Sequence, residues 1–479
     1  MQTMKSQTPK PVTFRFNNIG PVKEAEMELG DLTIIAGRNN TGKTYLVYTL
    51  YGFLKMLNSW HHGDFFLEGA KYQDAGFPDI DWITEEVTRE GSTSFPLDGE
   101  KIRQQQRLVI QELARKFSDR TLSSVFSTQQ SDFEGSSIEV TLNEPPFKDS
   151  YYVYEGLDKD VYLSTEYDGS SVRVAVDLTE KRLSVEDLES DITEHYISLL
   201  LDDLFPEVFI LSAERFGISL FYRELDFTKN QLVDMLQKMG DAKSRGRVSP
   251  FLLINRTTSR YALPIKDNID YTRGIPNLQK RRSEIFESKL FDDIKNMMDG
   301  YYGSSGDDIR FISKARKKGG KFNIPLHLAS SSARGLADFY FFLKHVATKN
   351  HLLIVDEPES HLDTSNQILL ARLLARCVRA GLKVLITTHS DYLIKEINNL
   401  VMLSRPFEDK EAVLKKLKYS ADDFLNPDAI RAYVAEDKGL MRCDVDRFGI
   451  DMPVFDETID KINRVANDLA SRMSEDSEA

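Results

Sequence analysis

Cysteine is scarce in this chain: Cys377 and Cys443 are the only two among 479 residues. Two isolated cysteines form neither a disulfide framework nor a zinc-binding pair, so we expect the reducing cytoplasm as the compartment. Long apolar runs are also missing, since stretches such as 352–355 are far too short to cross a bilayer. Residues 1–11 are polar and contain no apolar signal-peptide core. The sequence therefore predicts a cytoplasmic protein without a membrane partner.

The chain has no excess of positive charge. It contains 62 Lys and Arg against 75 Asp and Glu, which gives a net charge of −13. The overall field of an acidic protein does not attract nucleic acid, so such a contact needs a local basic patch. Hydrophobic residues make up 41% and charged residues 29%, as in folded proteins. The length predicts two or three packed units.

The hydrophobic pattern predicts strands and helices in turn along the chain. Strands are predicted at 12–17, 31–36, 136–142, 151–155, 161–178 with a turn at Asp168–Gly169, and 205–212, and helices at 43–56 and 184–204. Residues 230–302 are predicted to be mainly helical and broken by Pro264 and Pro276. No sustained heptad repeat is present, so we expect no long coiled coil.

A basic hairpin is predicted at 308–329, followed by helix, strand, helix and strand up to Thr388. Its turn carries five cations: Lys314, Arg316, Lys317, Lys318 and Lys321. This turn is either a solvated hairpin tip or an anion-binding element for nucleic acid or an acidic trigger protein.

Residues 37–44 fit the pattern G-x-x-x-x-G-K-[ST] and lie between a predicted buried strand and a predicted helix. Such a loop turns its backbone N–H groups toward anionic phosphates, and glycine at both ends permits the turn. Lys43 supplies a charge to the outer phosphates and Thr44 a hydroxyl to Mg²⁺. The predicted phosphate-binding residues are Gly37, Arg38, Asn39, Asn40, Thr41, Gly42, Lys43 and Thr44.

Two later strands end in polar residues suited to the same chemistry. An aliphatic strand at 352–355 leads into Asp356 and Glu357. We expect Asp356 to hold Mg²⁺ through a water molecule and Glu357 to polarise the attacking water. The next predicted strand ends in His389, which we interpret as a sensor of the γ-phosphate.

The ordered motifs GRNNTGKT, LLIVDEPESHLD and ITTHS resemble those of the ABC-type ATPases, in the branch that contains RecF, the SMC proteins and the OLD-like nucleases. The resemblance covers residues 12–56 and 324–400 well. It implies an α/β ABC-type P-loop ATPase head with a mixed sheet, plus a helical and β insertion region. It also implies ATP and Mg²⁺ as cofactors and hydrolysis between head-to-tail subunits.

The resemblance implies further site residues. Residues 360–363 match the D-loop, which ends in Asp363 and crosses a dimer interface. Ser330, Ser331 and Ser332 lie where the family has a glycine-rich signature that binds the γ-phosphate of the partner subunit, with Ser330 our first choice. The alternative is a simple helix N-cap. The family's Q-loop glutamine has no obvious counterpart; Glu214 or Arg215 is a candidate, and a structural ion pair is the other interpretation.

The resemblance also divides the chain into regions. These are 1–56, the first part of the head; 57–228, the rest of that lobe with its inserts; 229–305, a helical insert; 306–400, the second part of the head; and 401–479, a strand and helix tail. OLD-like nucleases continue into a TOPRIM domain, for which this tail is short. Asp444 and Asp446 have no strand-Gly-Glu element before them, so we expect no nuclease site.

Three cellular roles remain open. The first is the ATP-hydrolysing sensor or scaffold of a bacterial anti-phage system that controls a separate effector, such as a TOPRIM nuclease. The ATPases of the PARIS system and, less closely, of Septu are of this kind, and the missing nuclease domain favours this role. The second is a RecF-like DNA repair ATPase. The third is a scaffold with structural ATP, against which Asp356 and Glu357 argue. The expected partners are a second copy, in a dimer or larger homo-oligomer, the effector, and a phage trigger protein or nucleic acid.

Overall fold

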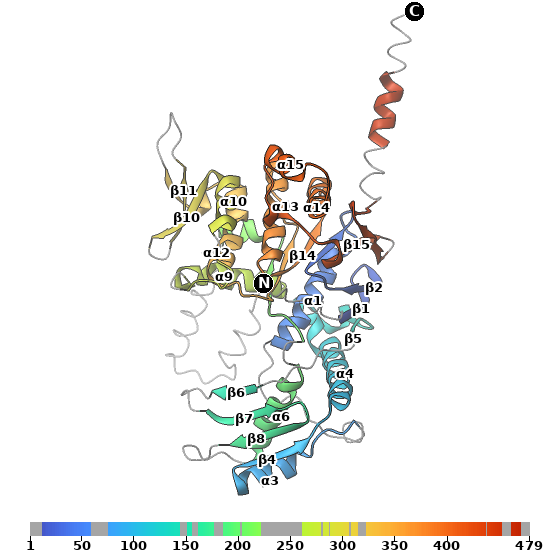
Figure 1. Ribbon diagram of the computed structural model, residues 1–479, viewed down its shortest axis with the longest axis vertical. Helices are drawn as coiled ribbons and strands as arrows, with labels where there is room; N and C mark the ends of the chain where they lie inside the picture. The colour runs from blue at the N-terminus through green and yellow to red at the C-terminus, as the bar shows by residue number, and fades with distance from the viewer. Residues whose placement is uncertain are drawn as a thin grey trace, which may run out of the picture. The chain divides into compact units, whose positions relative to one another are not determined.

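The structure is a computed structural model, and it describes most of the chain. The described residues are 12–58, 75–143, 151–155, 161–176, 185–201, 204–221, 261–278, 281–286, 288–305, 308–314, 322–436, 438–452 and 461–470. The chain forms two compact units: residues 1–15, 53–121 and 137–207 make the first, and residues 16–52, 122–136 and 208–479 the second. Figure 1 labels their helices and strands.

A nine-stranded mixed sheet has the strand order β5-β1-β2-β16-β15-β3-β14-β13-β9. Its strands are β1 (Val12–Ile19), β2 (Val22–Glu28), β3 (Leu32–Ala36), β5 (Ser137–Leu142), β9 (Val208–Leu211), β13 (Leu352–Asp356), β14 (Lys383–Thr388), β15 (Ile430–Glu436) and β16 (Gly439–Cys443). The run β15-β3-β14-β13-β9 is parallel. These findings confirm the predicted α/β class with a mixed sheet.

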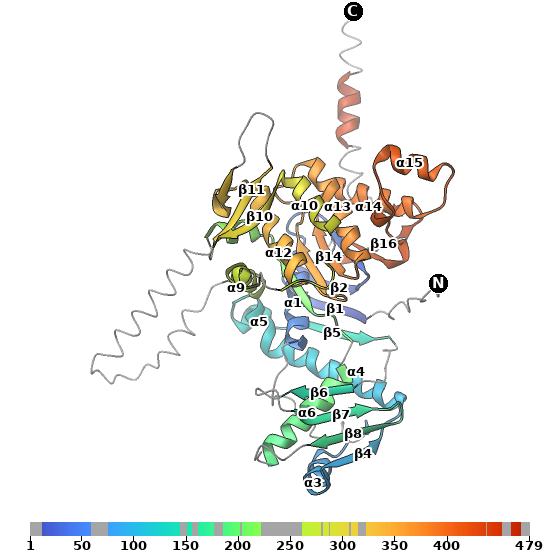
Figure 2. The ribbon, with the colours of Figure 1, turned by 60° about the vertical axis from the view of Figure 1, so that its left-hand side comes forward.

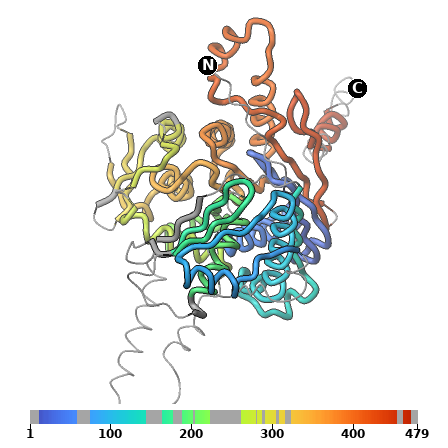
Figure 3. The backbone as a smooth tube through the Cα atoms, turned by 60° about the horizontal axis from the view of Figure 1, so that its bottom comes forward, coloured from blue at the N-terminus to red at the C-terminus, as the bar shows by residue number. Residues whose placement is uncertain are grey.

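The chain's C-terminal part enters the middle of this sheet. β15 pairs in parallel with β3, so residues about four hundred positions apart lie side by side, as Figures 1 and 3 show. β16 turns back antiparallel to β15 and meets β2. The sequence predicts only a strand and helix tail here, because short strands of mixed polarity give no clear period.

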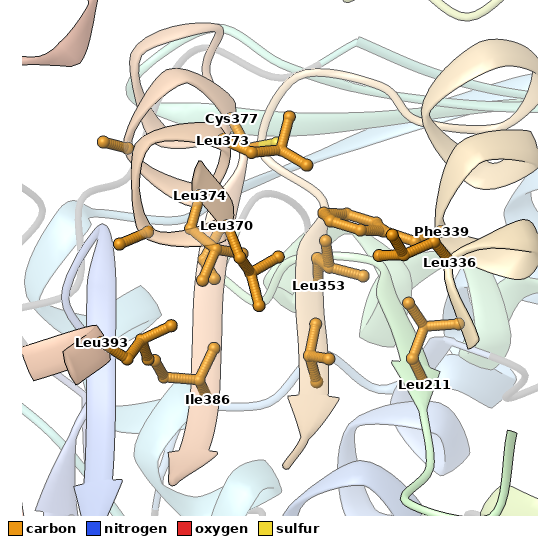
Figure 4. Close-up of a cluster of buried hydrophobic side chains, with 14 of the residues drawn as sticks. Leu211, Leu336, Phe339, Leu353, Leu370, Leu373, Leu374, Cys377, Ile386 and Leu393 are labelled. Atoms are coloured by element: carbon orange, nitrogen blue, oxygen red, sulfur yellow. The ribbon is translucent and has the colours of Figure 1, made fainter. Parts of the chain in front are cut away.

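The central strands are buried on both faces, as their largely apolar sequences require. Every residue of β3 and β13 is buried. Helix α13 (Thr364–Arg379) covers one face: Figure 4 shows Leu370 and Leu374 beside Leu353 of β13 and Ile386 of β14. Further helices of the second unit are α1 (Lys43–Asn58), which the first unit shares, α11 (Ser331–Gly335), α12 (Ala337–His345), α14 (Asp391–Ser404) and α15 (Lys410–Leu417).

The first unit contains an antiparallel sheet with the order β4-β8-β7-β6. Its elements are α3 (Ile80–Glu90), β4 (Ser92–Pro96), α4 (Gly99–Lys116), β6 (Tyr151–Glu155), β7 (Val161–Tyr167), β8 (Ser171–Val176) and α6 (Val185–Leu201). Figure 2 shows α6 packed on this sheet. The predicted turn at Asp168 is confirmed. The Asp168 carboxylate accepts hydrogen bonds from the backbone N–H groups of Ser170 and Ser171, which lowers its pKa to about 2.

Helix α9 (Leu263–Leu278) shows that the helix breaks predicted at Pro264 and Pro276 were wrong. The helix contains both prolines. Pro264 is its second residue, where a missing N–H costs nothing, and Pro276 lies in its last turn, where little helix remains to disrupt. Residues 230–260 of the predicted helical segment lie outside the described residues.

A three-stranded antiparallel sheet with the order β10-β11-β12 follows the helix α10 (Ser288–Met298). The strands are β10 (Gly300–Ser305), β11 (Asp308–Ser313) and β12 (Asn323–Pro325), and the predicted hairpin is β11-β12. Lys314 is described, but Arg316, Lys317, Lys318 and Lys321 lie outside the described residues.

The described part of the C-terminal tail continues with a two-stranded pair, β17 (Val445–Asp446) and β18 (Gly449–Ile450), and with a helical segment at 461–470. The predicted helix from 456 onward falls partly outside the described residues. Among the helices that the structure describes, none is both long and apolar enough to cross a membrane.

A buried carboxyl group lies between α9 and α12 in the second unit. Asp338 is 1% exposed, and its carboxylate oxygens lie 3.2 and 3.3 Å from Thr272 Oγ1. Burial raises the pKa of Asp338 to about 7, against the opposing effects of the Thr272 hydrogen bond and the Arg215 charge. The folded protein therefore holds this proton more tightly than the unfolded chain.

We expect Asp338→Asn to remove a pH-dependent loss of stability. Near pH 5 the unfolded carboxyl has lost its proton, while the folded carboxyl keeps it until the pH reaches about 7. The parent should thus lose about 1.4 kcal/mol of stability per pH unit relative to the variant across this window. Urea unfolding at pH 5, 6 and 7 measures the difference. Asp270→Asn, at an exposed carboxylate of α9, is the control. A pH-independent difference would contradict the assignment.

Candidate functional site

Three predicted motifs meet at one edge of the nine-stranded sheet. β14 lies between β3 and β13, and all three run in parallel. Ala36 pairs with Thr388 and Asp356 with Thr387, so the strands end at the same level. The loop at 37–42, the pair Asp356 and Glu357, and His389 therefore come together.

The loop after β3 has the backbone that its two glycines permit. Gly37 has φ +144° and Gly42 φ +92°. A Cβ atom at Gly37 would lie 2.7 Å from the carbonyl oxygen of Ala435 in β15, and one at Gly42 would lie 2.5 Å from Val22 Cγ2. Both positions therefore require glycine for space as well as for conformation. Arg38, Asn39 and Asn40 are exposed at the tip.

Lys43 lies inside this loop. Its Nζ donates hydrogen bonds to the carbonyl oxygens of Gly37 and Arg38, each at 2.8 Å. Burial lowers the pKa of Lys43, while the charges of Glu357, Asp356 and Glu359 oppose that effect. Thr41 Oγ1 also donates to the Arg38 carbonyl, at 2.9 Å. The ammonium group is thus held by the carbonyls of the same loop.

Asp356 and Thr44 form an oxygen donor pair. Thr44 Oγ1 donates to Asp356 Oδ2 at 3.1 Å, and Thr387 Oγ1 donates to Asp356 Oδ1. Burial raises the pKa of Asp356 to about 6, and the two threonine hydrogen bonds lower it. A carboxylate and a hydroxyl are ligands that Mg²⁺ prefers. The residues present therefore fit the ion that the sequence predicts here.

Glu357 has a strained backbone, with φ +49°. Neighbouring groups hold this conformation: the Glu357 N–H donates to Thr387 Oγ1 at 3.0 Å, and Arg215 Nη2 donates to the Glu357 carbonyl at 2.8 Å. Ser360 Oγ donates to Glu357 Oε2 at 3.1 Å. The carboxylate that we expect to polarise water is thus fixed at both its backbone and its side chain.

The two Q-loop candidates lie next to each other after β9 but point differently. Arg215 is buried, and its Nη1 donates to the carbonyls of Ser212 at 3.0 Å and Asp356 at 2.8 Å. Burial lowers the pKa of Arg215, and Asp356 is the strongest of the opposing charges. Glu214 is exposed and accepts a hydrogen bond from Tyr48 of α1 at 3.2 Å. Arg215 therefore fixes the backbone of the turn at Asp356 and Glu357, and only Glu214 has its charged group exposed.

Sequence reasoning missed Glu359 and Thr387. Glu359 is 4% exposed, and its Oε1 accepts hydrogen bonds from Thr388 Oγ1 and the His389 N–H, both at 2.8 Å. His389 Nδ1 lies 3.4 Å from the same oxygen. A carboxylate two residues beyond Glu357 was the available signal, but it follows a proline, which is typical of an exposed turn.

The predicted signature and D-loop residues act as helix caps within this chain. Ser330 Oγ accepts from the Ala333 N–H at 3.3 Å at the start of α11, and Ser332 Oγ lies 3.2 Å from it. Asp363 accepts from the N–H groups of Ser365 and Asn366 at the start of α13. Within one chain the serines therefore cap helix α11. Their binding to the phosphate of a partner subunit stays a prediction.

The fold and these motifs define a P-loop ATPase domain. The chain belongs to the family described as "AAA domain, putative AbiEii toxin, Type IV TA system", whose model matches residues 120–395. The glycine-rich loop at 37–44 precedes that range. The family is one of ATPases, and it implies a nucleotide ligand.

Solved structures similar to this chain include SMC heads. The SMC head domain from Thermotoga maritima is 11% identical, with a TM-score of 0.30, and the match covers 91% of this chain and 99% of that one. An SmcHead bound to the C-winged helix domain of ScpA is 12% identical, also with a TM-score of 0.30, with 81% and 92% covered. No curated protein matches the chain.

We expect Arg215→Met to reduce ATP hydrolysis by about tenfold or more, as loss of an outer positioning residue does. The change removes the Arg215 hydrogen bonds to the carbonyls of Asp356 and Glu357, but it leaves Lys43 and the loop intact. Hydrolysis rates and the binding of a fluorescent ATP analogue separate the two effects. Arg379→Met, at an exposed arginine of α13, is the control. Unchanged hydrolysis in a folded Arg215→Met variant would contradict the positioning role.

Proposed function

We propose that this chain binds ATP with Mg²⁺ and hydrolyses it slowly between two head-to-tail copies. One observation carries the proposal: Lys43, the Thr44 and Asp356 pair, and Glu357 come together at the ends of adjacent parallel strands. Ligand sites in open α/β sheets lie outside the carboxyl ends of the strands, where this cluster lies.

Each residue has a role that its chemistry supports. The backbone N–H groups of the loop bind the phosphates, and Lys43 leaves the carbonyls of Gly37 and Arg38 to pair with their charge. Thr44 and Asp356 hold Mg²⁺, which neutralises phosphate charge when bound. Glu357 orients and polarises the attacking water, and His389 contacts the γ-phosphate.

The second copy completes the site in this proposal. Ser330, Ser331 and Ser332 surround the N-terminus of α11, and Ser330 is exposed there. Hydroxyls and N–H groups at a helix start favour an anion. Asp363 begins α13 at the end of the turn that starts at Glu357. These residues would meet the phosphate of the partner copy.

The cellular role that we propose is control of a separate effector in a bacterial anti-phage system, with a TOPRIM-type nuclease as the effector class. The description of the family, which names a toxin of a type IV toxin–antitoxin system, supports a defence-related role. Among the described residues, no group of three or more His, Cys, Asp or Glu side chains is arranged to hold a metal ion. A RecF-like or SMC-like DNA repair ATPase is the alternative, and the net charge of −13 argues against it.

We expect Glu357→Gln to bind ATP and accumulate a dimer, because it removes the group that polarises water and keeps the phosphate-binding residues. Lys43→Ala should neither bind ATP nor dimerise. Size-exclusion chromatography with light scattering, with and without ATP and Mg²⁺, measures assembly, and phosphate release measures hydrolysis. Equal hydrolysis rates in Glu357→Gln and the parent would refute the catalytic role.

We also expect the purified chain to leave DNA and RNA intact with ATP and either Mg²⁺ or Mn²⁺. Phosphodiester cleavage generally needs metal-binding carboxylates or a positioned acid and base. Gel electrophoresis of labelled substrates tests this. Cleavage that survives Lys43→Ala but disappears in Asp444→Ala would reveal a metal site in the C-terminal region.

A further inference from the structure

Glu359 is a buried carboxylate that accepts hydrogen bonds from a hydroxyl and a backbone N–H, whereas a carboxylate in a structural ion pair contacts an Arg or Lys. Its Oε1 atom accepts hydrogen bonds from Thr388 and from the His389 backbone. Its Oε2 atom is buried and makes no hydrogen bond within the part of the chain that the structure describes. Glu396, also 4% exposed, instead pairs directly with Arg372 at 2.7 Å. Among the described residues no Lys or Arg pairs directly with Glu359, and only the more distant charges of Arg215 and Lys43 act on it. Burying a carboxylate without a direct cation partner is costly, so the position of Glu359 needs an explanation beyond stability.

That explanation lies in the imidazole of His389. Its side chain is 45% exposed, and Nδ1 lies 3.4 Å from Glu359 Oε1 and 3.9 Å from Glu357 Oε1. A carboxylate accepts hydrogen bonds, so this approach favours the tautomer that carries its hydrogen on Nδ1. In that tautomer Nε2, on the other side of the ring, is the nitrogen without a hydrogen.

The turn between β13 and α13 places both carboxylates at one ring nitrogen. Glu357 adopts φ +49°, and the Ser360 N–H donates to its carbonyl at 3.1 Å. The Leu362 N–H donates to the Glu359 carbonyl at 3.0 Å. Backbone hydrogen bonds within the turn therefore fix its shape, and the turn brings the side chains of Glu357 and Glu359 to the end of β14.

We propose that Glu359 is a positioning residue for His389: it accepts the Nδ1–H, fixes the tautomer and ring orientation, and so presents Nε2 to the terminal phosphate. Carboxylates orient metal-bound and catalytic histidines in this way. Because phosphate oxygens accept hydrogen bonds, Nε2 of that tautomer would donate to one only after the ring takes up a second proton. The identity of the ligand rests on the proposed function, but the tautomer is a property of the chain alone.

The tautomer is measured by ¹H–¹⁵N spectra of the histidine side chains in the labelled full-length chain without nucleotide, at a pH where the rings are neutral. His389→Gln assigns the signal. We expect the Nδ1–H form in the parent and loss of that preference in Glu359→Ala. Glu396→Ala, the same change at an equally buried carboxylate, should leave the signal unchanged. Glu359→Met, which retains the side-chain length, replaces Glu359→Ala if that variant does not fold.

Kinetics supply the second measurement. Glu359→Ala should lower kcat for ATP hydrolysis by about 10- to 100-fold, as removal of outer-shell partners does, with little change in the Kd of a fluorescent ATP analogue. Glu359→Gln, which keeps an oxygen acceptor, should recover part of the rate. An Nδ1–H form that persists in folded Glu359→Ala or Glu359→Met would overturn the proposal even if the parent hydrolyses ATP. Loss of that form in these variants, with a parent that hydrolyses no ATP, would support the positioning role and refute the proposed function.

Discussion

The parallel pairing of β3, β14 and β13 is the constraint on which the site depends. Because the three strands end at the same level, residues more than three hundred positions apart become hydrogen-bonding neighbours, as Thr44 and Asp356 do. The pairing is stable because these strands are apolar on both faces and helix α13 covers them. The hydrophobic core thus fixes the distances between the polar side chains of the site, which add little apolar packing of their own.

Lys43 and Asp356, at the ends of the strands, are charged groups whose burial costs free energy. Their hydrogen bonds partly offset that cost. Burial opposes ionisation of both Lys43 and Asp356. Loop carbonyls hold the ammonium group, and two threonine hydroxyls hold the carboxylate, each such bond contributing roughly 1.5–3 kcal/mol. These are the bonds that a phosphate and a divalent cation would replace. The same groups would then serve the ligand with little rearrangement of the backbone.

Much of the sheet could be predicted from sequence, because continuous apolar runs between glycines and polar ends specify β3, β13 and β14. The loop at 37–44 could be predicted as well, since glycine spacing has a direct steric meaning. The insertion of β15 beside β3 could not, because strand partners far apart in sequence leave no local pattern. The prediction at Pro264 was wrong because a proline is tolerated at the start of a helix but breaks or kinks its middle. Glu359 gains its role only from the turn that contains it, and Thr387 only from the pairing of β14 with β13.

The turn from Asp356 to Ser360 connects the chemistry to the rest of the second unit. Its strained Glu357 backbone is held from one side by Arg215, which follows β9, and from the other by Thr387 of β14. Arg215 also carries a charge that acts on Asp338 in α12, the helix that follows the capping serines. Arg215 after β9, Thr387 of β14 and Asp338 of α12 are therefore connected by hydrogen bonds or by charge around the Glu357 backbone. Such a backbone conformation persists only while its surroundings determine it. Arg215 thus acts on the Glu357 backbone through a hydrogen bond and on Asp338 through its charge, so one buried guanidinium connects the turn beside the phosphate-binding loop with helix α12.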